Sequence, residues 1–197
     1  MKNKRWFKRS GQWALTACAL GISTGSFAAA PTAAMLSNAC ASCHGTHGGS
    51  AGLAMPSLAG QSKEAIVDAM KKFKSGERPS TIMGRLAKGY SDAEFAAMGD
   101  FFSAQKLHIT EQTLDKARIA QGAKLQDSNC GRCHLEEGKE GKDDTPAMAS
   151  QWLTYLQMQM ALYLNDQRKM PEKMKEKVQA LTADEIESLL HFYASVK

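Results

Sequence analysis

The chain lacks several features that would place it in common functional classes. Aromatic residues make up 7% of its 197 residues, and no alternating pattern long enough for a useful strand occurs, so strands are not expected. No acidic residue precedes Glu64, but the excess of positive charge is local: five of the 25 basic residues lie within Met1–Arg9, and the other 20 equal the 20 acidic residues. A nucleic-acid-binding protein keeps a clustered positive charge. We therefore expect a globular protein without a nucleic-acid partner.

The amino-terminal segment lacks an apolar run long enough to span a membrane. The run Trp13–Ile22 is short and is diluted by Thr and Gly. A basic stretch precedes it, and small residues ending in Ala28 follow it, which is typical of a secretory signal peptide. We predict a signal peptide at residues 1–28 and a mature chain that works in the oxidising periplasm without a membrane anchor. Cys18 could alternatively be a lipid-modified cysteine, but the apolar run continues beyond it, and we interpret it as part of the signal peptide.

The other four cysteines form two C-x-x-C-H motifs, Cys40–His44 and Cys130–His134. This motif is the covalent attachment signal of c-type haem: the two thiols add to the porphyrin vinyl groups, and the histidine becomes the proximal iron ligand. A single zinc site would place the two pairs about 15–20 residues apart, and a thioredoxin-like pair would follow a βαβ pattern. Two structural disulfides would leave the following histidines unexplained. We predict two covalently bound haem c groups attached at Cys40, Cys43, Cys130 and Cys133, with His44 and His134 as proximal ligands.

The motifs belong to an internal repeat. Pro56–Gln61 aligns with Pro146–Gln151 at an offset of 90 residues, and Ser91–Glu94 aligns with Thr182–Glu185 at an offset of 91. The second pair are capping boxes that open amphipathic helices. Each unit is too small to be stable by side-chain burial alone, so a buried haem would supply part of its core. We predict two haem c domains, residues 29–107 and 108–197, in an all-α fold with helices at Ala33–Cys40, Lys63–Phe73, Asp92–Gln105, Leu114–Leu125, Gln151–Leu164 and Ala183–Val196.

The distal iron position determines whether a haem carries electrons or binds substrate. A methionine placed downstream would fill this position, raise the potential and favour electron transfer. Met83 and Met174 each lie eight residues before a capping box, and we predict them as the two distal ligands. Met83 falls in a segment that we interpret as a loop. Met170, one helical turn from Met174, is the alternative ligand in the second half.

Two arginines, Arg78 and Arg168, occupy equivalent positions in the repeat. A guanidinium binds a carboxylate through two hydrogen bonds, so each arginine could bind the propionates of a haem. The alternative is an exposed loop arginine, and the sequence does not choose between the two. The charged run Glu136–Asp144 is interpreted as a solvated loop, with a docking patch as the alternative.

Several segments resemble the di-haem cytochrome subunit of flavocytochrome c sulfide dehydrogenases, namely Pro31–Cys40, Cys43–Gly48, Phe73–Tyr90 and His191–Ser195. The likeness covers essentially the whole mature chain and is strongest in the first half. It implies two tandem class I cytochrome c domains related by a pseudo-twofold axis. It also implies that His44 and Met83 bind one iron, and His134 and Met174 the other.

The resemblance further implies a partner. In this family an FAD-containing flavoprotein forms a heterodimer with the cytochrome, oxidises sulfide, and passes electrons singly to the haems for delivery to a soluble acceptor. The cytochrome itself needs no catalytic residue, and we expect its first haem domain to contact the flavoprotein. Leu135–Asp144 and Lys169–Lys173 depart from the family pattern.

Two alternatives remain. Freestanding di-haem cytochromes of the c-four type share the duplicated C-x-x-C-H and P-x-L-x-G-Q elements and donate electrons to terminal oxidases. A large exposed apolar patch would favour a permanent partner, whereas a charged rim would favour transient docking. A di-haem enzyme such as a peroxidase would need one open iron position.

Overall fold

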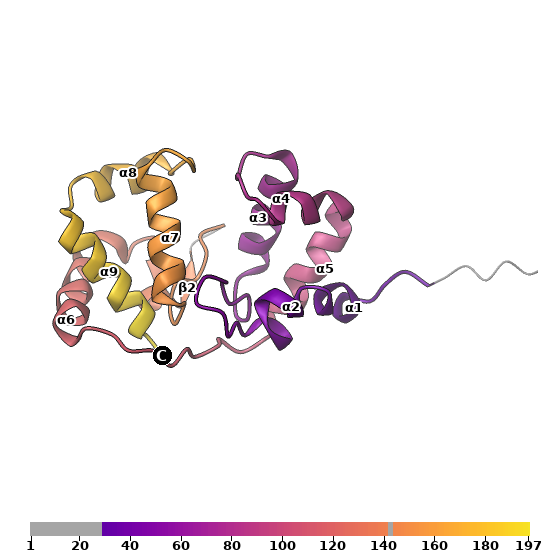
Figure 1. The fold of residues 1–197 in the computed structure, drawn as a ribbon, viewed down its shortest axis with the longest axis horizontal. Helices are drawn as coiled ribbons and strands as arrows, with labels where there is room; N and C mark the ends of the chain where they lie inside the picture. The colour runs from indigo at the N-terminus through magenta and orange to yellow at the C-terminus, as the bar shows by residue number, and fades with distance from the viewer. Residues whose placement is uncertain (1–28, 142–143) are drawn as a thin grey trace, which may run out of the picture. The chain divides into compact units, whose positions relative to one another are not determined.

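The secondary structure is almost entirely helical, and extended loops at residues 49–62 and 104–115 join some of the helices (Figure 1). A computed structural model describes residues 29–141 and 144–197; the predicted signal peptide, including Cys18, lies outside the described residues. The α-helices are α1 (Ala33–Asn38), α2 (Ala41–His44), α3 (Lys63–Ser75), α4 (Met83–Leu86), α5 (Asp92–Ser103), α6 (Lys116–Leu125), α7 (Leu153–Leu164), α8 (Glu172–Gln179) and α9 (Ala183–Ser195). The shorter elements are the 3₁₀ turns η1 (Thr46–Gly48), η2 (Ala87–Gly89) and η4 (Glu136–Gly138), the π-helical turn η3 (Gln126–Cys130), and the antiparallel strands β1 (His134–Leu135) and β2 (Glu140–Gly141).

The predicted all-α class is confirmed, and each predicted helix has a counterpart whose ends differ by a few residues. Three short helices, α2, α4 and α8, were not predicted, and Met83 begins α4 rather than lying in a loop. The segment interpreted as a solvated loop, Glu136–Asp144, contains η4 and strand β2. Elements of two to eight residues show too little periodicity to be recognised from sequence. No helix among the described residues is long and apolar enough to cross a membrane.

The two predicted capping boxes are present. The Ser91 hydroxyl accepts the Glu94 amide, while the Glu94 carboxylate accepts the Ser91 amide at 2.7 Å. Thr182 and Glu185 form the same reciprocal pair at the start of α9. Each box satisfies amide groups that the first helical turn leaves without partners. The repeat seen in the sequence therefore extends to the local geometry at the start of α5 and α9.

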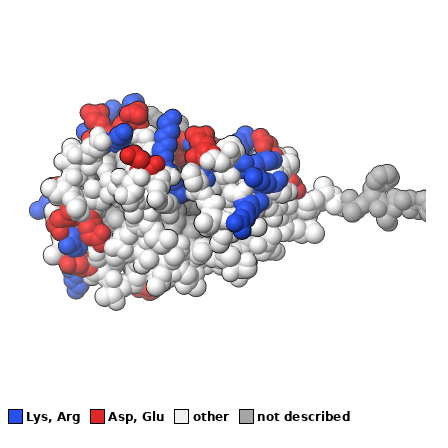
Figure 2. All heavy atoms as spheres, turned by 45° about the horizontal axis from the view of Figure 1, so that its top comes forward, with Lys and Arg blue, Asp and Glu red and all other residues white. Residues whose placement is uncertain are grey.

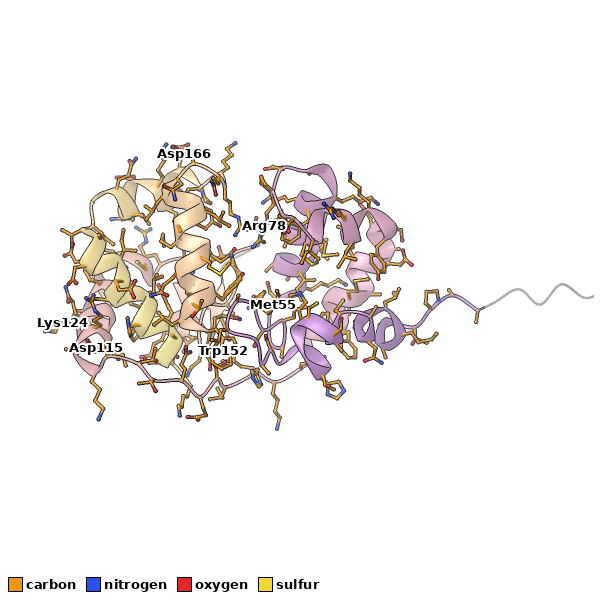
Figure 3. The ribbon with its side chains drawn as sticks, in the orientation of Figure 1. Met55, Arg78, Asp115, Lys124, Trp152 and Asp166 are labelled. Carbon is orange, nitrogen blue, oxygen red and sulfur yellow. The ribbon has the colours of Figure 1, made fainter. Side chains whose placement is uncertain are left out.

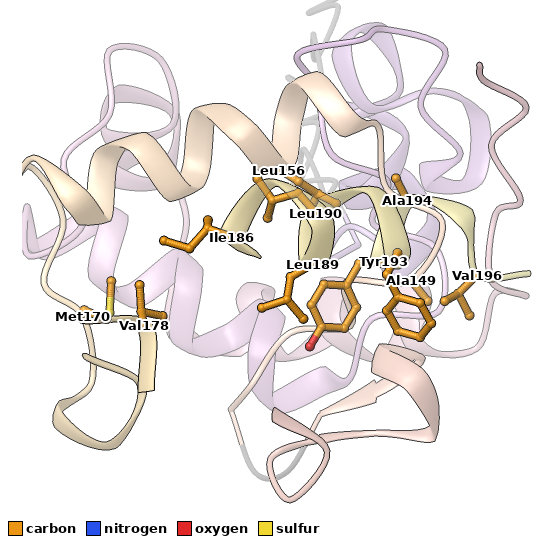
Figure 4. Close-up of a cluster of buried hydrophobic side chains, with 11 residues drawn as sticks. Ala149, Leu156, Met170, Val178, Ile186, Leu189, Leu190, Tyr193, Ala194 and Val196 are labelled. Atoms are coloured by element: carbon orange, nitrogen blue, oxygen red, sulfur yellow. The ribbon is translucent and has the colours of Figure 1, made fainter. Parts of the chain in front are cut away.

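Each half of the chain has its own hydrophobic core. The first is formed mainly by α1, α3 and α5 and is centred on Phe95 and Met98, whose side chains are at most 2% exposed. The second is formed by α6, α7 and α9, with residues of α9 at its centre (Figure 4). Helices α6 and α9 approach closely because Gly122 has no side chain: a Cβ atom there would lie 2.1 Å from the Ser188 carbonyl oxygen.

Two glutamines join the halves reciprocally. Gln61 of the first half accepts the Ala147 amide at 2.9 Å and donates to the Ala147 carbonyl at 2.8 Å. Gln151 of the second half makes the same pair of bonds to the Ser57 amide and carbonyl, each 2.9 Å long. Because both donors and both acceptors are repeat equivalents, this is the pattern of an isologous contact. It agrees with the predicted pseudo-twofold relation within the compact unit Pro31–Lys197.

Candidate haem sites

In the first half, the C-x-x-C-H motif forms a helical turn. Cys40 is the N-cap residue of α2, and the His44 amide donates to the Cys40 carbonyl at 2.9 Å. The buried His44 ring donates its Nδ1–H to the Pro56 carbonyl oxygen at 2.9 Å. This bond fixes the tautomer in which Nε2 is free to bind a metal. Burial lowers the pKa of His44, which keeps the ring in the neutral form that ligates iron.

The other predicted groups of the first half lie around the same core. Cys40 and Met83 both pack against the buried cluster that contains Phe95. Burial raises the pKa of the Cys40 thiol, whereas Cys43 is exposed. The Cys40 thiol and the distal methionine predicted from sequence therefore pack against one core, although Met83 lies 43 positions after Cys40 in the chain.

In the second half, the motif is less regular. Cys130 ends the π-helical turn η3, the Cys133 amide donates to the Cys130 carbonyl at 3.1 Å, and His134 lies in strand β1 rather than in a helix. The His134 Nδ1 atom is buried and has no hydrogen-bond partner among the described residues. Burial lowers the pKa of His134 to about 4. This ring is therefore neutral like His44, but its orientation is not fixed by a hydrogen bond.

Both candidate methionines of the second half lie at the second core. Met170 is buried, at 8% exposure, and the partly buried Met174 of α8 packs against the same cluster, as does Cys130. Figure 4 shows Met170 beside Val178 at one end of this cluster and Val196 at the other. The fold thus brings Met170 and Met174 to the same core, and their burial does not choose between them.

Arg78 and Arg168 converge, although they belong to different halves. Arg78 extends toward α7 in Figure 3, and burial together with the charge of Arg78 lowers the pKa of Arg168. Burial raises the pKa of Tyr155 on α7, whereas the charges of both arginines lower it. The Nε atoms of both arginines are buried without hydrogen-bond partners in the described part of the chain.

These arrangements fit haem c. Each half offers two thiols, a neutral buried imidazole and a thioether, which are the groups that attach and ligate this cofactor, and the thioether and one thiol of each half pack against its core. The unpaired Nε–H groups of Arg78 and Arg168 are donors suited to carboxylates such as haem propionates. A zinc site is not supported, because within residues 29–141 and 144–197 no three His, Cys, Asp or Glu side chains are placed to hold a metal ion.

Two features of this region were not predicted. The duplicated Gln61 and Gln151 were noticed as part of a repeat, but their reciprocal bonding between the halves was not expected. Tyr155 lies in a predicted helix and is aligned by the repeat with Ala65, so no motif marks it. Only the contact between the halves places Tyr155 beside the arginines.

Comparisons with known proteins find two cytochrome c segments in the chain. Residues 29–115 match the family model "Cytochrome c", and residues 117–192 match "Cytochrome C oxidase, cbb3-type, subunit III". Over 68 residues the chain is 47% identical to the cytochrome subunit of sulfide dehydrogenase from Chlorobaculum tepidum, a match that covers 34% of this chain and 61% of that relative. The chain therefore matches less than two thirds of the length of this curated relative.

Two longer matches are weaker in sequence. A thiosulfate dehydrogenase electron acceptor from Thiomonas intermedia is 28% identical over 153 residues, which cover 73% of this chain and 69% of the relative. The structure of reduced recombinant cytochrome c4 from Pseudomonas stutzeri superposes with a TM-score of 0.73 at 24% identity, covering 85% of this chain and all of that one. This likeness shows the fold, two class I cytochrome c domains in tandem.

Proposed function

Because the chain is a di-haem cytochrome c with an electron-transfer role, we propose that it is a periplasmic electron-transfer subunit that forms a heterodimer with an FAD-containing sulfide dehydrogenase flavoprotein. It accepts electrons from the flavin and passes them to a soluble acceptor. The observation that carries this proposal is the 47% identity to the cytochrome subunit of sulfide dehydrogenase. The predicted signal peptide at residues 1–28 supports the location.

The residues proposed to hold the two haems follow the repeat. Domain 29–107 attaches one haem through Cys40 and Cys43, and domain 108–197 attaches the other through Cys130 and Cys133. His44 with Met83, and His134 with Met174, are the proposed iron ligands. The gathering of Cys40 with Met83, and of Cys130 with Met174, around separate cores supports these pairings.

Each haem supplies an iron that changes oxidation state by one electron, and the protein residues hold that iron in a fixed environment. His44 is oriented by its bond to Pro56, which limits movement of the ring during electron transfer. Arg78 and Arg168 are proposed to bind haem propionates, since their buried Nε–H groups need acceptors. Both arginines lie where the halves meet, so this pairing would place the propionate edges of the two haems near one another.

The first half offers an apolar surface for a permanent partner. Ile82 and Leu86, four residues apart at the start and end of helix α4, are 50% and 53% exposed and flank Met83. Exposed apolar side chains of this kind favour a stable interface. On the face shown in Figure 2, Lys and Arg mingle with Asp and Glu in bands, beside a broad area without charge. The exposed Ile82 and Leu86 side chains support docking of a protein through the first domain.

The alternative function is that of a freestanding di-haem carrier that donates electrons to a terminal oxidase. The fold shared with cytochrome c4 and the match to a thiosulfate dehydrogenase electron acceptor favour this reading. Both functions use the same haem sites and differ in the presence of a fixed flavoprotein partner.

Purification of the native protein under mild conditions separates the two functions. Haem absorbance and flavin fluorescence are followed across the same fractions at low and high salt. We expect flavin to elute with haem at one flavin per two haems, and added sulfide to reduce the haems. Haem that elutes without flavin at the mass of the mature chain would contradict the heterodimer and favour the freestanding carrier.

A further inference from the structure

Two buried positions close to each haem motif are occupied by different kinds of residue in the two halves. By the repeat, Leu36 and Phe102 of the first half correspond to Gln126 and Tyr193 of the second. All four side chains are buried, with exposures between 2% and 8%. An apolar pair in the first half is therefore replaced by an equally buried polar pair in the second.

The polar pair contacts the second motif directly. The Tyr193 hydroxyl donates to Gln126 Oε1, and Gln126 Nε2 donates to the His134 carbonyl oxygen at 2.7 Å. The Tyr193 and His134 rings meet edge to face, with centroids 6.0 Å apart. Tyr193 also lies beside Cys130. Burial raises the pKa of the Tyr193 hydroxyl, and the neighbouring Cys130 thiol raises it further. Beside the second motif, an oriented polar pair therefore occupies the positions that Leu36 and Phe102 fill beside the first.

Two carboxylates add to this difference. Glu136 and Glu137 follow His134 and, with Gln126, line a hollow of about 220 Å³. Their repeat equivalents in the first half are Thr46 and His47. These two positions are thus neutral or basic in the first half and acidic in the second, and their two negative charges outweigh the single positive charge of Arg132, which replaces Ser42.

We propose that the Gln126–Tyr193 pair, together with Glu136 and Glu137, makes the haem at Cys130 and Cys133 the lower-potential haem of the chain. An oxidised haem carries one more positive charge than a reduced one. Polar groups and nearby carboxylates stabilise that additional charge, whereas an apolar shell does not. A single electron accepted by the chain then resides mainly on the first haem. The proposal rests on the proposed attachment of one haem to each motif.

Redox titration of the full-length holo-cytochrome, followed by haem absorbance, tests the proposal. The variant Q126L/Y193F gives the second half the apolar pair of the first and removes both partners of the Tyr193–Gln126 bond, while the His134 carbonyl loses the donor that Gln126 supplied. We expect the lower of the two potentials to rise, so that the reduced fraction of that haem increases several-fold at a fixed applied potential. A tenfold change in this ratio corresponds to about 59 mV for one electron.

Matched variants extend the test. L36Q/F102Y places the polar pair in the first half and is expected to lower the higher potential. E136Q/E137Q is expected to raise the lower potential by an amount that shrinks as salt is added, because exposed charges are screened. A Q126L/Y193F variant that only loosened the second half would admit water and lower that potential, the opposite of the expected rise. E136Q/E137Q leaves the core unchanged, so it remains informative if a core variant fails to fold.

The outcomes are separable. If Q126L/Y193F leaves both potentials unchanged, or moves the higher one, the assignment of potentials is wrong while the haem sites stand. If mass spectrometry finds fewer than two haems on the wild-type chain, the proposed attachment fails and this proposal fails with it.

Discussion

The two halves of this chain share a repeat, a fold and a C-x-x-C-H motif, but they hold the motif differently. In the first half the motif is a closed helical turn, and Pro56 fixes the His44 ring. In the second half His134 lies in a short strand, and its buried Nδ1 has no partner among the described residues. The first site is therefore organised by the protein alone, whereas the second depends more on the haem that it binds. Duplication preserved the attachment chemistry and let the surroundings diverge.

Removal of the attachment cysteines is the strongest test of this comparison. We expect C40S/C43S and C130S/C133S each to leave a chain with one haem, measured by mass spectrometry. C130S/C133S should lose more helical circular dichroism than C40S/C43S. Without haem, the first motif keeps the hydrogen bond that holds His44, whereas the second has no such bond at His134 among the described residues. Equal losses in the two variants would show that the halves depend on haem to the same extent.

The distal ligand of the second half can be separated from core packing. M174A is expected to convert one of the two haems from a six-coordinate to a five-coordinate spectrum, as M83A does for the other. M170A should keep both haems six-coordinate but lower the free energy of unfolding by about 2–5 kcal/mol, because it opens a cavity in the core. A spectral change in M170A, with none in M174A, would assign Met170 as the ligand instead.

The contacts made by Gln61 and Gln151 are equivalent in geometry, and we expect them to contribute equally to the free energy of unfolding. Q61A leaves the amide and carbonyl of Ala147 without partners, and Q151A does the same to Ser57. Each group left unpaired costs about 1–3 kcal/mol when it stays buried. We expect similar decreases in denaturant midpoint for the two variants. A large effect from only one variant would show that the two contacts have the same geometry but contribute unequally to stability.

The capping boxes should give the smallest effect and the closest agreement between halves. Hydrogen bonds from the Ser91 backbone and side chain lower the pKa of Glu94, and those from Thr182 lower the pKa of Glu185. A carboxyl whose pKa is lowered in the folded state makes its full contribution to stability at pH values above its ordinary pKa of 4.5. This contribution is lost as the pH falls through the lowered pKa.

Glutamine can keep the cap but cannot titrate. E94Q and E185Q should therefore each reduce the acid dependence of the thermal midpoint slightly, with little change at neutral pH. Midpoints measured from pH 3 to 7 check this, and an unchanged acid slope in both variants would contradict it.

Sequence reasoning succeeded where chemistry or periodicity is local. The haem motifs, the capping boxes and the long helices all follow from neighbouring residues. The fold confirms the capping boxes and the long helices, and the family models confirm the cytochrome c character that the motifs predict. It failed for α4 and α8, because each derives its stability from packing against a core rather than from its own pattern. Consequently Met83 was placed in a loop rather than at the start of α4.

The sequence by itself determined the cofactor, the duplication and the all-α class, since two C-x-x-C-H motifs and a repeat at an offset of 90 residues are properties of the linear chain. Only the tertiary structure decided which side chains meet. It paired Gln61 with Ala147, brought Arg78 and Arg168 together, and placed Gln126 and Tyr193 beside His134. These contacts join residues far apart in the chain, and their geometry depends on how complete helices pack, which no local pattern encodes.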